Sequence, residues 1–309
     1  MNQTVVGIDL GGTKVALAEL DGTSLGESVL EPTDTSDTTA LLDQLVALVE
    51  RTRSERLAAV GVGVPSVVEF ESGRVVSSVN IPLRDVALRE VLGERLGVPV
   101  FVDNDATVAA LAEAHDEELR LVAHDLVMLT IGTGVGGGLV LGGQIYRGAT
   151  GGAAELGHTI VGLDITDRVP EPNGFPQPGS LESLASGQAL DRLAGHPGAE
   201  TVQAAHDGDP EAQAYVEQWA ERIGIGVANA INTFDPQEVV LGGGGAQAGE
   251  LLLEPARRIA KGYVVPGLGG RTTIRLARHG VRAGVLGAAL LAEQEIGHRR
   301  THAASSVTR

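Results

Sequence analysis

Residues 151–162, which read GGAAELGHTIVG, place a carboxylate and an imidazole three positions apart just after paired glycines. In a helical turn, Glu155 and His158 would lie on one face. Such a pair suits a metal ion, a proton relay or a polyhydroxyl ligand equally well, and it also suits a plain structural turn. A metal site would need a third ligand, for which Glu182 or Asp164 could serve. The stretch alone does not decide among these roles.

A second group of polar residues follows the apolar run VPVFV, where Asp103, Asn104 and Asp105 precede a helical pattern. Asn or Asp directly before a helix is a common N-cap, which is the structural interpretation. α/β proteins also place ligands at the carboxyl ends of strands. These residues are therefore candidates both for capping and for binding.

Glycine-rich turns follow three apolar strands, at Asp9 to Lys14, Thr130 to Gly138 and Gly242 to Gly245. Backbone N–H groups in such turns can converge on an anion, although a single copy could be an ordinary hairpin turn. The segments match neither the Walker pattern nor a Rossmann turn, because GTGVGG lies between two strands rather than before a helix. If phosphates bind here, hairpins hold them.

The predicted elements describe one design used twice. The segment TVVGIDL, GGTK, VALAEL predicts a β-hairpin, and residues 125–143 repeat it. Between the copies we expect helices at 38–54, 88–97 and 106–119, strands at 58–65 and 98–104, and a hairpin at 67–79. Alternating helices and strands after a hairpin indicate an α/β domain with a mixed sheet.

The second half begins with a long proline-containing loop at 162–180. The following segments predict helices at 180–195 and 209–234, then a strand, a four-glycine turn and a helix within 236–262. A last helix is predicted at 283–297, followed by a frayed tail at 298–309.

Composition excludes several classes of protein. The 309 residues are enough for two compact domains, and the net charge of −17 disfavours nucleic acid and anionic membrane surfaces as partners. The chain has no cysteine, which excludes disulfides, thiolate metal sites and cysteine nucleophiles. Neither a signal peptide nor a long apolar span is found, so we expect a cytoplasmic protein. Lys14 and Lys261 are the only lysines, which makes a lysine in a glycine turn notable.

The segments IDLGGTK, NDATVAALAE, IGTGVGGG, AELGH and VVLGGGG occur in this order along nearly the whole chain. Together they resemble the ROK sugar kinases, the bacterial glucokinase group of the actin-like ATPase superfamily. The resemblance implies a two-lobed actin-like ATPase (ribonuclease H-like) α/β fold with a mixed sheet and flanking helices in each lobe. ATP and sugar would meet in the cleft. We expect a small lobe at 1–118, onto which helix 283–297 packs back, and a large lobe at 119–309.

The resemblance also implies roles for individual residues. Asp105 would be the general base, and Asn104 would hold a neighbouring sugar hydroxyl. Glu155, His158 and Glu182 would be the other sugar ligands. Gly11, Gly12, Thr13 and Lys14 would form the first phosphate turn, Gly132, Thr133 and Gly134 the second, Gly243 and Gly244 would lie beside the adenosine, and Asp9 would lie near Mg²⁺.

The chain departs from the family pattern at two places. Many ROK members bind a structural zinc ion through three cysteines and the histidine of the AELGH-type motif, but this chain lacks those cysteines. We therefore expect no structural zinc, and the loop at 164–179 must be held by its prolines and by packing. Ser66 also replaces a glycine that is frequent near the sugar in this family.

The implied reaction is ATP- and Mg²⁺-dependent phosphorylation of a hexose, with glucose as the first choice. Mannose, fructose, allose, N-acetylmannosamine and N-acetylglucosamine stay open as acceptors, and polyphosphate as a donor. Two rivals are a non-catalytic sugar-binding protein and a repressor of the same family. The acidic charge and the absence of a basic N-terminal segment disfavour a repressor. The expected partner is a small-molecule sugar, and we expect a homodimer or homotetramer.

Overall fold

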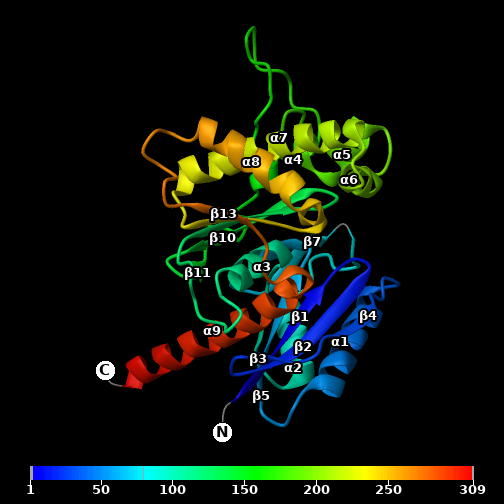
Figure 1. Cartoon of the computed structure of the whole chain (residues 1–309). Helices are drawn as coiled ribbons and strands as arrows, with labels where there is room; N and C mark the ends of the chain where they lie inside the picture. The colour runs from blue at the N-terminus through cyan, green and yellow to red at the C-terminus, as the bar shows by residue number, and fades with distance from the viewer. Residues whose placement is uncertain (1–2, 79, 308–309) are drawn as a thin grey trace. The chain divides into compact units, whose positions relative to one another are not determined.

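The computed structural model of the chain describes residues 3–78 and 80–307, with the side chains of the final helix described as far as His298. Contacts divide the chain into two compact units (Figure 1). Unit 1 comprises residues 1–122, 144–153 and 281–309, and unit 2 comprises residues 123–143 and 154–280. Residues 144–153 therefore group with unit 1, whereas the sequence placed them in the large lobe.

Unit 1 is built on a mixed sheet in the order β3-β2-β1-β5-β8, with β4 also paired to β2. Its strands are β1 (Thr4–Leu10), β2 (Lys14–Asp21), β3 (Ser24–Leu25), β4 (Val29–Pro32), β5 (Leu57–Val64) and β8 (Val100–Asn104). Strands β1 and β2 form the predicted antiparallel hairpin, whereas β1, β5 and β8 are parallel. The central strands are almost entirely buried, which explains their continuous apolar sequences.

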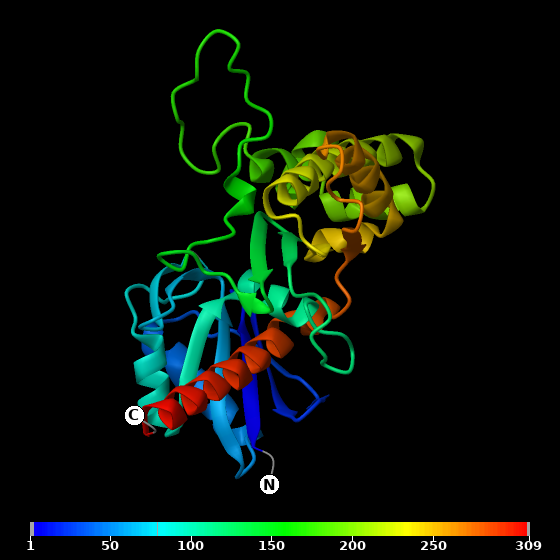
Figure 2. The ribbon, with the colours of Figure 1, turned by 90° about the vertical axis from the view of Figure 1, so that its left-hand side faces the viewer.

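The two faces of this sheet carry different cores. On one face, Val6 and Ile8 of β1 pack in a cluster with residues of helices α1 (Thr38–Thr52) and α2 (Leu88–Leu96). Side chains alternate between the faces of a strand, so Gly7 points to the opposite side. There α3 (Asp105–Glu113) and α9 (Ala283–Val307) pack on the sheet and on each other. Figure 2 shows α9, in red, lying across the strands of this unit.

Helix α9 approaches the sheet closely because glycines leave it room. A Cβ atom built on Gly61 would lie 1.8 Å from the Ala288 carbonyl oxygen, and one on Gly7 would lie 2.1 Å from that of Val285. On the helix itself, a Cβ atom on Gly287 would lie 1.7 Å from the Val108 carbonyl oxygen of α3. Backbone meets backbone at these contacts, so the glycines are required by packing.

A smaller hairpin and a short turn complete unit 1. The hairpin is formed by β6 (Ser66–Glu69) and β7 (Arg74–Ser78), as predicted. After β11 (Gln144–Ile145), the chain turns back so that the Ala153 N–H donates to the Arg147 carbonyl oxygen at 3.0 Å. The turn packs on β6, because a Cβ atom on Gly151 would lie 2.3 Å from the Val68 carbonyl oxygen.

Unit 2 contains a second mixed sheet in the order β10-β9-β12-β13. Its strands are β9 (Leu126–Ile131), β10 (Val135–Leu141), β12 (Glu238–Gly242) and β13 (Thr273–Leu276). Strands β9 and β10 form the second predicted antiparallel hairpin, and β9, β12 and β13 are parallel. The two sheets thus share one plan of a hairpin followed by parallel strands, which confirms the repeated design expected from the sequence.

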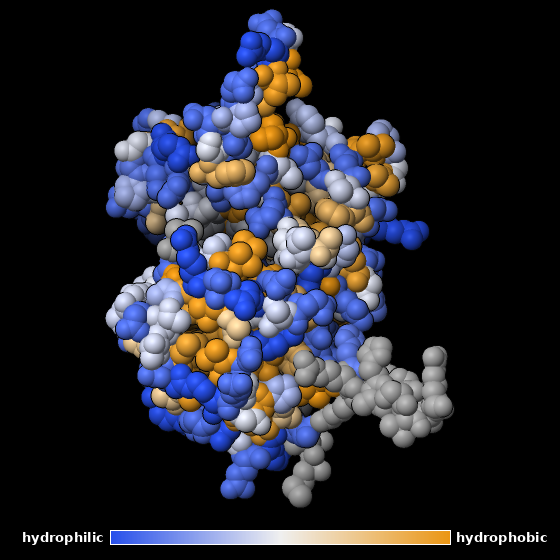
Figure 3. Space-filling model, turned by 180° about the vertical axis from the view of Figure 1, so that it is seen from behind, coloured by the Kyte–Doolittle hydropathy of each residue, from blue (hydrophilic) through white to orange (hydrophobic). Residues whose placement is uncertain are grey.

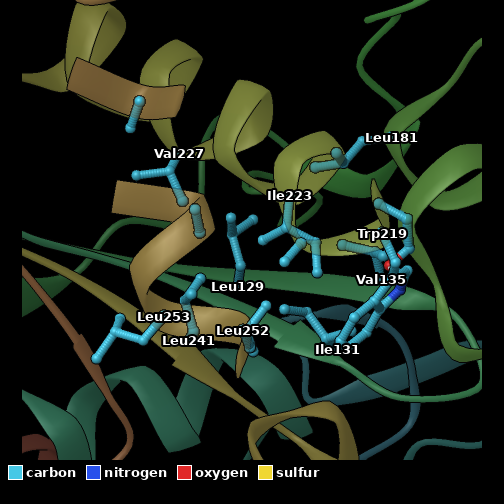
Figure 4. Close-up of a cluster of buried hydrophobic side chains, with 14 of the residues drawn as sticks. Leu129, Ile131, Val135, Leu181, Trp219, Ile223, Val227, Leu241, Leu252 and Leu253 are labelled. Carbon is cyan, nitrogen blue, oxygen red and sulfur yellow. The ribbon is translucent and has the colours of Figure 1, made fainter. Parts of the chain in front are cut away.

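Helices pack on the unit 2 sheet around a continuous apolar core. The helical elements are η1 (Leu156–His158), α4 (Leu181–Ala185), α5 (Gly187–Ala194), α6 (Gly198–His206), α7 (Pro210–Phe234), η2 (Gly244–Ala248) and α8 (Glu250–Tyr263), and η3 (Gly280–Arg282) precedes α9. Figure 4 shows side chains of α7, such as Ile223, together with Leu129 and Leu241 of the sheet. The fully buried Trp219 donates from Nε1 to the Ala185 carbonyl oxygen at 2.9 Å, which fixes α7 against α4.

Four predicted elements differ in extent from those observed. Helix α3 ends at Glu113, short of the predicted 119, because Asp116 accepts the N–H groups of Glu118 and Arg120 in a local turn. The predicted helix at 180–195 is two helices, since Ser186 ends α4 and caps α5 through Ala189 N–H. The four-glycine turn leads into η2 rather than directly into a helix. Helix α9 continues to Val307, through most of the predicted tail, and residues 308–309 lie outside the described part.

The sequence did not predict the short elements β3, β4, β11 and η3, nor helix α6 and strand β13. Helix α6 follows Pro197, which supplies no side-chain cap. Strand β13 has only four residues, and its registration on β12 is supported by ion pairs of Arg275 and Arg278 with Glu238. Helix α6 and strand β13 are short and have weak local sequence patterns, and contacts with neighbouring elements stabilise them.

Figure 3 shows hydrophilic residues over much of one face, with apolar residues scattered among them. Within the described residues, no helix is long and apolar enough to cross a membrane.

Candidate functional site

In unit 1, the parallel strands bring the predicted residues to one edge of the sheet. Strand pairing sets Asp9 opposite Gly63, and Gly63 opposite Asp103. The first glycine turn follows β1 at this edge and is closed by a hydrogen bond from Gly11 N–H to the Lys14 carbonyl oxygen at 3.0 Å. Residues 9–14 and 103–105 therefore share the carboxyl edge, where α/β proteins bind ligands.

Asn104 is the N-cap of α3, as the structural interpretation predicted. Its Oδ1 accepts the N–H groups of Ala106 and Thr107 at 3.0 and 3.2 Å. Its Nδ2 donates to the Ser66 carbonyl oxygen at 3.4 Å, a long bond that leaves the second amide hydrogen for another acceptor. Capping and ligand binding are compatible here, because different atoms serve them.

Asp105 occupies the first position of α3 and is partly buried. Burial raises the pKa of its carboxyl group above the ordinary value, and hydrogen bonds from backbone N–H groups oppose the shift. The Ala106 N–H donates to Asp105 Oδ1 at 2.8 Å. A positioned carboxylate with a raised pKa is suited to accept a proton from a hydroxyl group.

Asp9 lies at the end of β1, beside the start of α9. A Cβ atom built on Gly284 would lie 2.3 Å from Asp9 Oδ2, so only glycine leaves room for the carboxylate. Burial, together with the negative charge of Asp105, raises the pKa of Asp9 to about 6, against the opposing effect of Lys14. A buried carboxylate of this kind is stabilised by a cation.

The residues present fit a magnesium ion bound with a phosphorylated ligand. Mg²⁺ is usually held by one or two carboxylates, several waters and substrate phosphates. Within the described residues, no group of three or more His, Asp or Glu side chains is arranged to hold a metal. Asp9 can supply the one carboxylate that Mg²⁺ needs when waters and phosphates provide its other ligands. A metal site built on Glu155, His158 and a third ligand is not formed among the described residues.

A pocket of about 570 Å³ opens beside Asp9 in unit 1. It is lined by Gly11 and Lys14 of the first hairpin, by Glu27 and Ser28, and by Arg282 at the start of α9, among others. Lys14 and Arg282 both bring positive charge to this pocket. Its volume is in the range of small-molecule sites.

In unit 2, the second and third glycine turns also share one sheet edge. Strand pairing sets Gly242 opposite Thr130, so residues 132–134 and 243–244 follow neighbouring parallel strands. Gly243 has φ +77°, and a Cβ atom there would lie 2.5 Å from the Ile131 carbonyl oxygen. Close approach of the backbone therefore requires glycine at position 243, whereas a Cβ atom built on Gly132 or Gly244 would meet no other atom within 4 Å.

Glu182 lies against the second turn. Its Oε2 accepts the Val135 N–H at 2.9 Å, and a Cβ atom on Gly134 would lie 2.3 Å from the same oxygen. The Gly187 N–H donates to the Gly132 carbonyl oxygen at 2.7 Å, which ties the start of α5 to this turn. The structure therefore brings one predicted sugar ligand next to a predicted phosphate turn.

Glu155 precedes the short 3-10 helix η1, and His158 is its last residue. His158 Nε2 lies 3.7 Å from Glu155 Oε2, and both side chains are exposed to solvent, by 37% and 60%. Neither imidazole nitrogen has a hydrogen bond to a described residue, so the structural alternative of a histidine bonded to backbone does not apply. Both groups are accessible to a ligand.

The base of the loop at 164–179 is closed by main-chain pairing. The Val161 and Gly162 N–H groups donate to the Gly179 carbonyl oxygen at 2.8 and 3.0 Å, and Leu181 N–H donates to Thr159. The ring of Phe175 meets that of His158 edge-on, with centroids 5.5 Å apart. The exposed Phe175 is a contact of His158 that the sequence did not reveal, because nothing in the local pattern links them.

The buried Asp103 and the partly buried Arg147 form an ion pair in unit 1, with Nε 2.7 Å from Oδ2. The sequence indicated Asp103 only as a neighbour of Asn104, and it gave no indication of Arg147. A tyrosine–arginine pair after a glycine turn is not distinctive. Pairing over such a sequence distance is visible only in the structure.

Comparison with known proteins now identifies the family. The ROK family model matches residues 5–295. A glucokinase of Halalkalibacterium halodurans is 33% identical, with 94% of this chain and 95% of the relative covered. An N-acetyl-D-glucosamine kinase of Salmonella typhimurium is 34% identical, with coverage of 92% and 98%. The structure of a ROK family glucokinase from Streptomyces griseus, in complex with glucose and AMPPNP, matches with TM-score 0.76 and 30% identity, over 94% of this chain and 99% of that one.

The chain therefore belongs to the ROK family. It is a sugar kinase with the actin-like ATPase fold, as the five motifs implied, and it lacks the cysteines of the zinc-binding members. Its relatives include kinases named for glucose and for N-acetyl-D-glucosamine.

Proposed function

We propose that this kinase transfers the terminal phosphoryl group of ATP to a hexose, most readily glucose, to give glucose 6-phosphate. The observation that carries the proposal is the placement of Asp105 at the carboxyl edge of β8, with a carboxyl group whose pKa is raised by burial. Neighbouring Asn104 keeps an amide hydrogen for a sugar hydroxyl. Asp105 contacts the sugar hydroxyl that attacks the phosphoryl group, and Asn104 contacts the hydroxyl beside it.

Asp105 acts as the general base. As the bond to phosphorus forms, its carboxylate accepts the proton of the attacking hydroxyl, and no covalent enzyme intermediate is required. The remaining contribution of the protein is to position the two substrates and stabilise charge. The α3 cap supports that role, because it fixes the backbone on which Asp105 is carried.

The glycine turns and Lys14 bind the donor. We assign Gly11, Gly12, Thr13 and Lys14 to one set of phosphate contacts, Gly132, Thr133 and Gly134 to another, and Gly243 and Gly244 to the adenosine. Asp9 would hold Mg²⁺, which supplies positive charge to the phosphate oxygens when it is bound. The AMPPNP complex of the Streptomyces griseus relative favours ATP over polyphosphate as donor.

Glu155, His158 and Glu182 serve as sugar ligands. The first two are exposed and free to bind hydroxyl groups, and their combination of acceptors and donors suits adjacent hydroxyls. Glu182 already accepts the Val135 N–H through Oε2, which leaves Oε1 for a hydroxyl. The glucokinase relatives favour glucose, and the Salmonella relative favours N-acetylglucosamine as the second candidate. We place the enzyme in the cytoplasm as a homodimer or homotetramer.

A coupled ADP-release assay with ATP and Mg²⁺ tests the proposal against a panel of hexoses and N-acetylhexosamines. We expect turnover of glucose to exceed that of N-acetylglucosamine, mannose, fructose, allose and N-acetylmannosamine. A chelator that removes zinc but spares magnesium should leave the rate unchanged. If the enzyme preferred an N-acetylhexosamine, glucose would be the wrong acceptor. If the folded protein phosphorylated no sugar, the roles assigned to the residues would be contradicted.

A further inference from the structure

Four side chains from distant parts of unit 1 converge behind the candidate base. Asp103 Oδ2 accepts a hydrogen bond from Arg147 Nε at 2.7 Å, and Arg147 Nη2 lies 3.4 Å from Glu295 Oε1 of α9. The Arg147 guanidinium group also lies over the ring of Phe70, 3.4 Å from its centroid. The arginine is thus fixed on three sides by groups from β8, α9 and the segment after β6.

The other carboxylate oxygen of Asp103 points to the candidate site. Asp103 Oδ1 accepts the N–H of Asn104 at 2.9 Å, and Asn104 caps α3 directly before Asp105. A continuous path of contacts therefore runs from Glu295 through Arg147 and Asp103 to the backbone that carries the base. No described contact places Arg147 itself on Asp105, so any influence passes through Asp103.

The charge of Arg147 is needed to keep this path intact. The Asp103 side chain is 3% exposed, and burial raises its pKa, while Arg147 lowers it. Removing one partner of a buried pair leaves the other charge uncompensated, which favours a protonated or displaced carboxyl group. Either change would loosen the Asn104 N–H bond and the start of α3.

We propose that Arg147 is a positioning residue for catalysis, which holds Asp103 so that Asn104 and Asp105 keep their reactive geometry. The inference rests on the proposed role of Asp105. Stability alone does not require an ion pair here, since a buried pair is often no more stabilising than apolar residues of similar volume. The planar guanidinium group instead provides direction, through its bond to Asp103 and its face against Phe70.

Steady-state kinetics of Arg147→Met and Arg147→Lys test the proposal. We expect kcat to fall on the order of 10- to 100-fold in Arg147→Met, because small displacements of a catalytic group have effects of that size. The KM for ATP should stay within about twofold, because the donor turns are untouched. Arg147→Lys should retain more activity, and guanidinium ion should partly restore that of Arg147→Ala.

Arg275→Met is the matched control. Arg275 pairs with Glu238 at side-chain exposures of 16% and 17%, close to the 20% of Arg147, but it lies in unit 2, in β13, and Glu238 is the first residue of β12. We expect Arg275→Met to lower the melting temperature without lowering kcat. An equal loss of kcat in both folded variants, or none in Arg147→Met, would overturn the positioning role.

Amide hydrogen exchange separates this inference from the proposed function. In Arg147→Met, the N–H groups of Asn104, Ala106 and Thr107 should exchange at least about tenfold faster than in the wild type, and Arg275→Met should leave them unchanged. The measurement needs no substrate. If the wild type phosphorylates no sugar but exchange at Asn104 responds to Arg147, the proposed function fails while the coupling stands; unchanged exchange would reject the coupling itself.

Discussion

At the scale of single residues, Asp9 and Asp105 of unit 1 both have carboxyl groups with raised pKa values, and the roles proposed for them both require the ionised form. Asp105 must have lost its proton to act as a base, and Asp9 must carry a negative charge to attract a cation. Burial opposes ionisation of both. The bound substrates and Mg²⁺ would therefore change the protonation of this edge as they arrive.

Asp105→Asn tests the base. The amide keeps the shape of the side chain but cannot accept the proton, so we expect kcat to fall about 100-fold or more with little change in KM for the sugar. Activity of the folded variant within tenfold of the wild type would contradict the assignment.

The pH profile provides a second test of Asp105. Because the base works only when ionised and burial raises its pKa, kcat/KM should fall as the pH is lowered, with an acid limb above the ordinary aspartate value of 3.8. An acid limb at or below that value would show that the pKa of the Asp105 carboxyl group is not raised in the free enzyme.

Asp9→Asn should separate stability from function. The folded pKa of about 6 exceeds the ordinary 3.8, so the folded chain holds this proton more tightly, and the wild type loses stability as the pH rises from about 4 to about 6. Above that window, Asp9→Asn should be more stable than the wild type by on the order of 1–3 kcal/mol, without Mg²⁺ or nucleotide present. Denaturant unfolding at pH 4 and pH 8 measures this. A stability gain of Asp9→Asn that is larger at pH 4 than at pH 8 would contradict the raised pKa of Asp9. The variant should also lose the activation of its kinase activity by Mg²⁺.

At the scale of elements, the packing of α9 on the unit 1 sheet depends on the absence of side chains. Gly61→Ala should destabilise the protein by about 3 kcal/mol, the upper part of the range for overpacking, because the new methyl group would meet the Ala288 backbone. Thermal and denaturant unfolding measure this loss.

Gly262→Ala is the control for that substitution. Gly262 lies in α8 with no atom near its built Cβ, so alanine should be neutral or stabilising by up to about 1 kcal/mol. Equal effects of the two changes would mean that α9 can shift away from β5 at little cost.

Several elements could be predicted from sequence because their patterns are local. Both hairpins combine apolar strands with glycine turns, and α1 repeats its apolar residues at helical spacing. The prediction misses the break at Ser186 because it treats the apolar spacing on its two sides as one helix, although Ser186 and Gly187 together are a signal for a break. Strand β13 depends on its partner β12, which its own four residues do not encode.

At the scale of the whole molecule, the family and the reaction class could be predicted because five short motifs recur in order over the chain. The contacts behind the site could not. Arg147 contacts Asp103, and Glu295 contacts Arg147, across long stretches of sequence, and only the fold brings these charges together. Phe175 likewise meets His158 only because the loop returns between its paired ends.

Unit 1 is built from segments on both sides of unit 2 in the chain, so its parts are synthesised at different times. The strands of its sheet precede unit 2 in the chain, but α9, which lies against Gly7 and Gly61, is translated after all of unit 2. Until α9 has been translated, the face of the sheet at Gly7 and Gly61 lacks this helix, while the residues of unit 2 emerge and can fold. Unit 1 closes only after translation of α9, so Asp9 first meets Gly284 after the residues of unit 2 have been made.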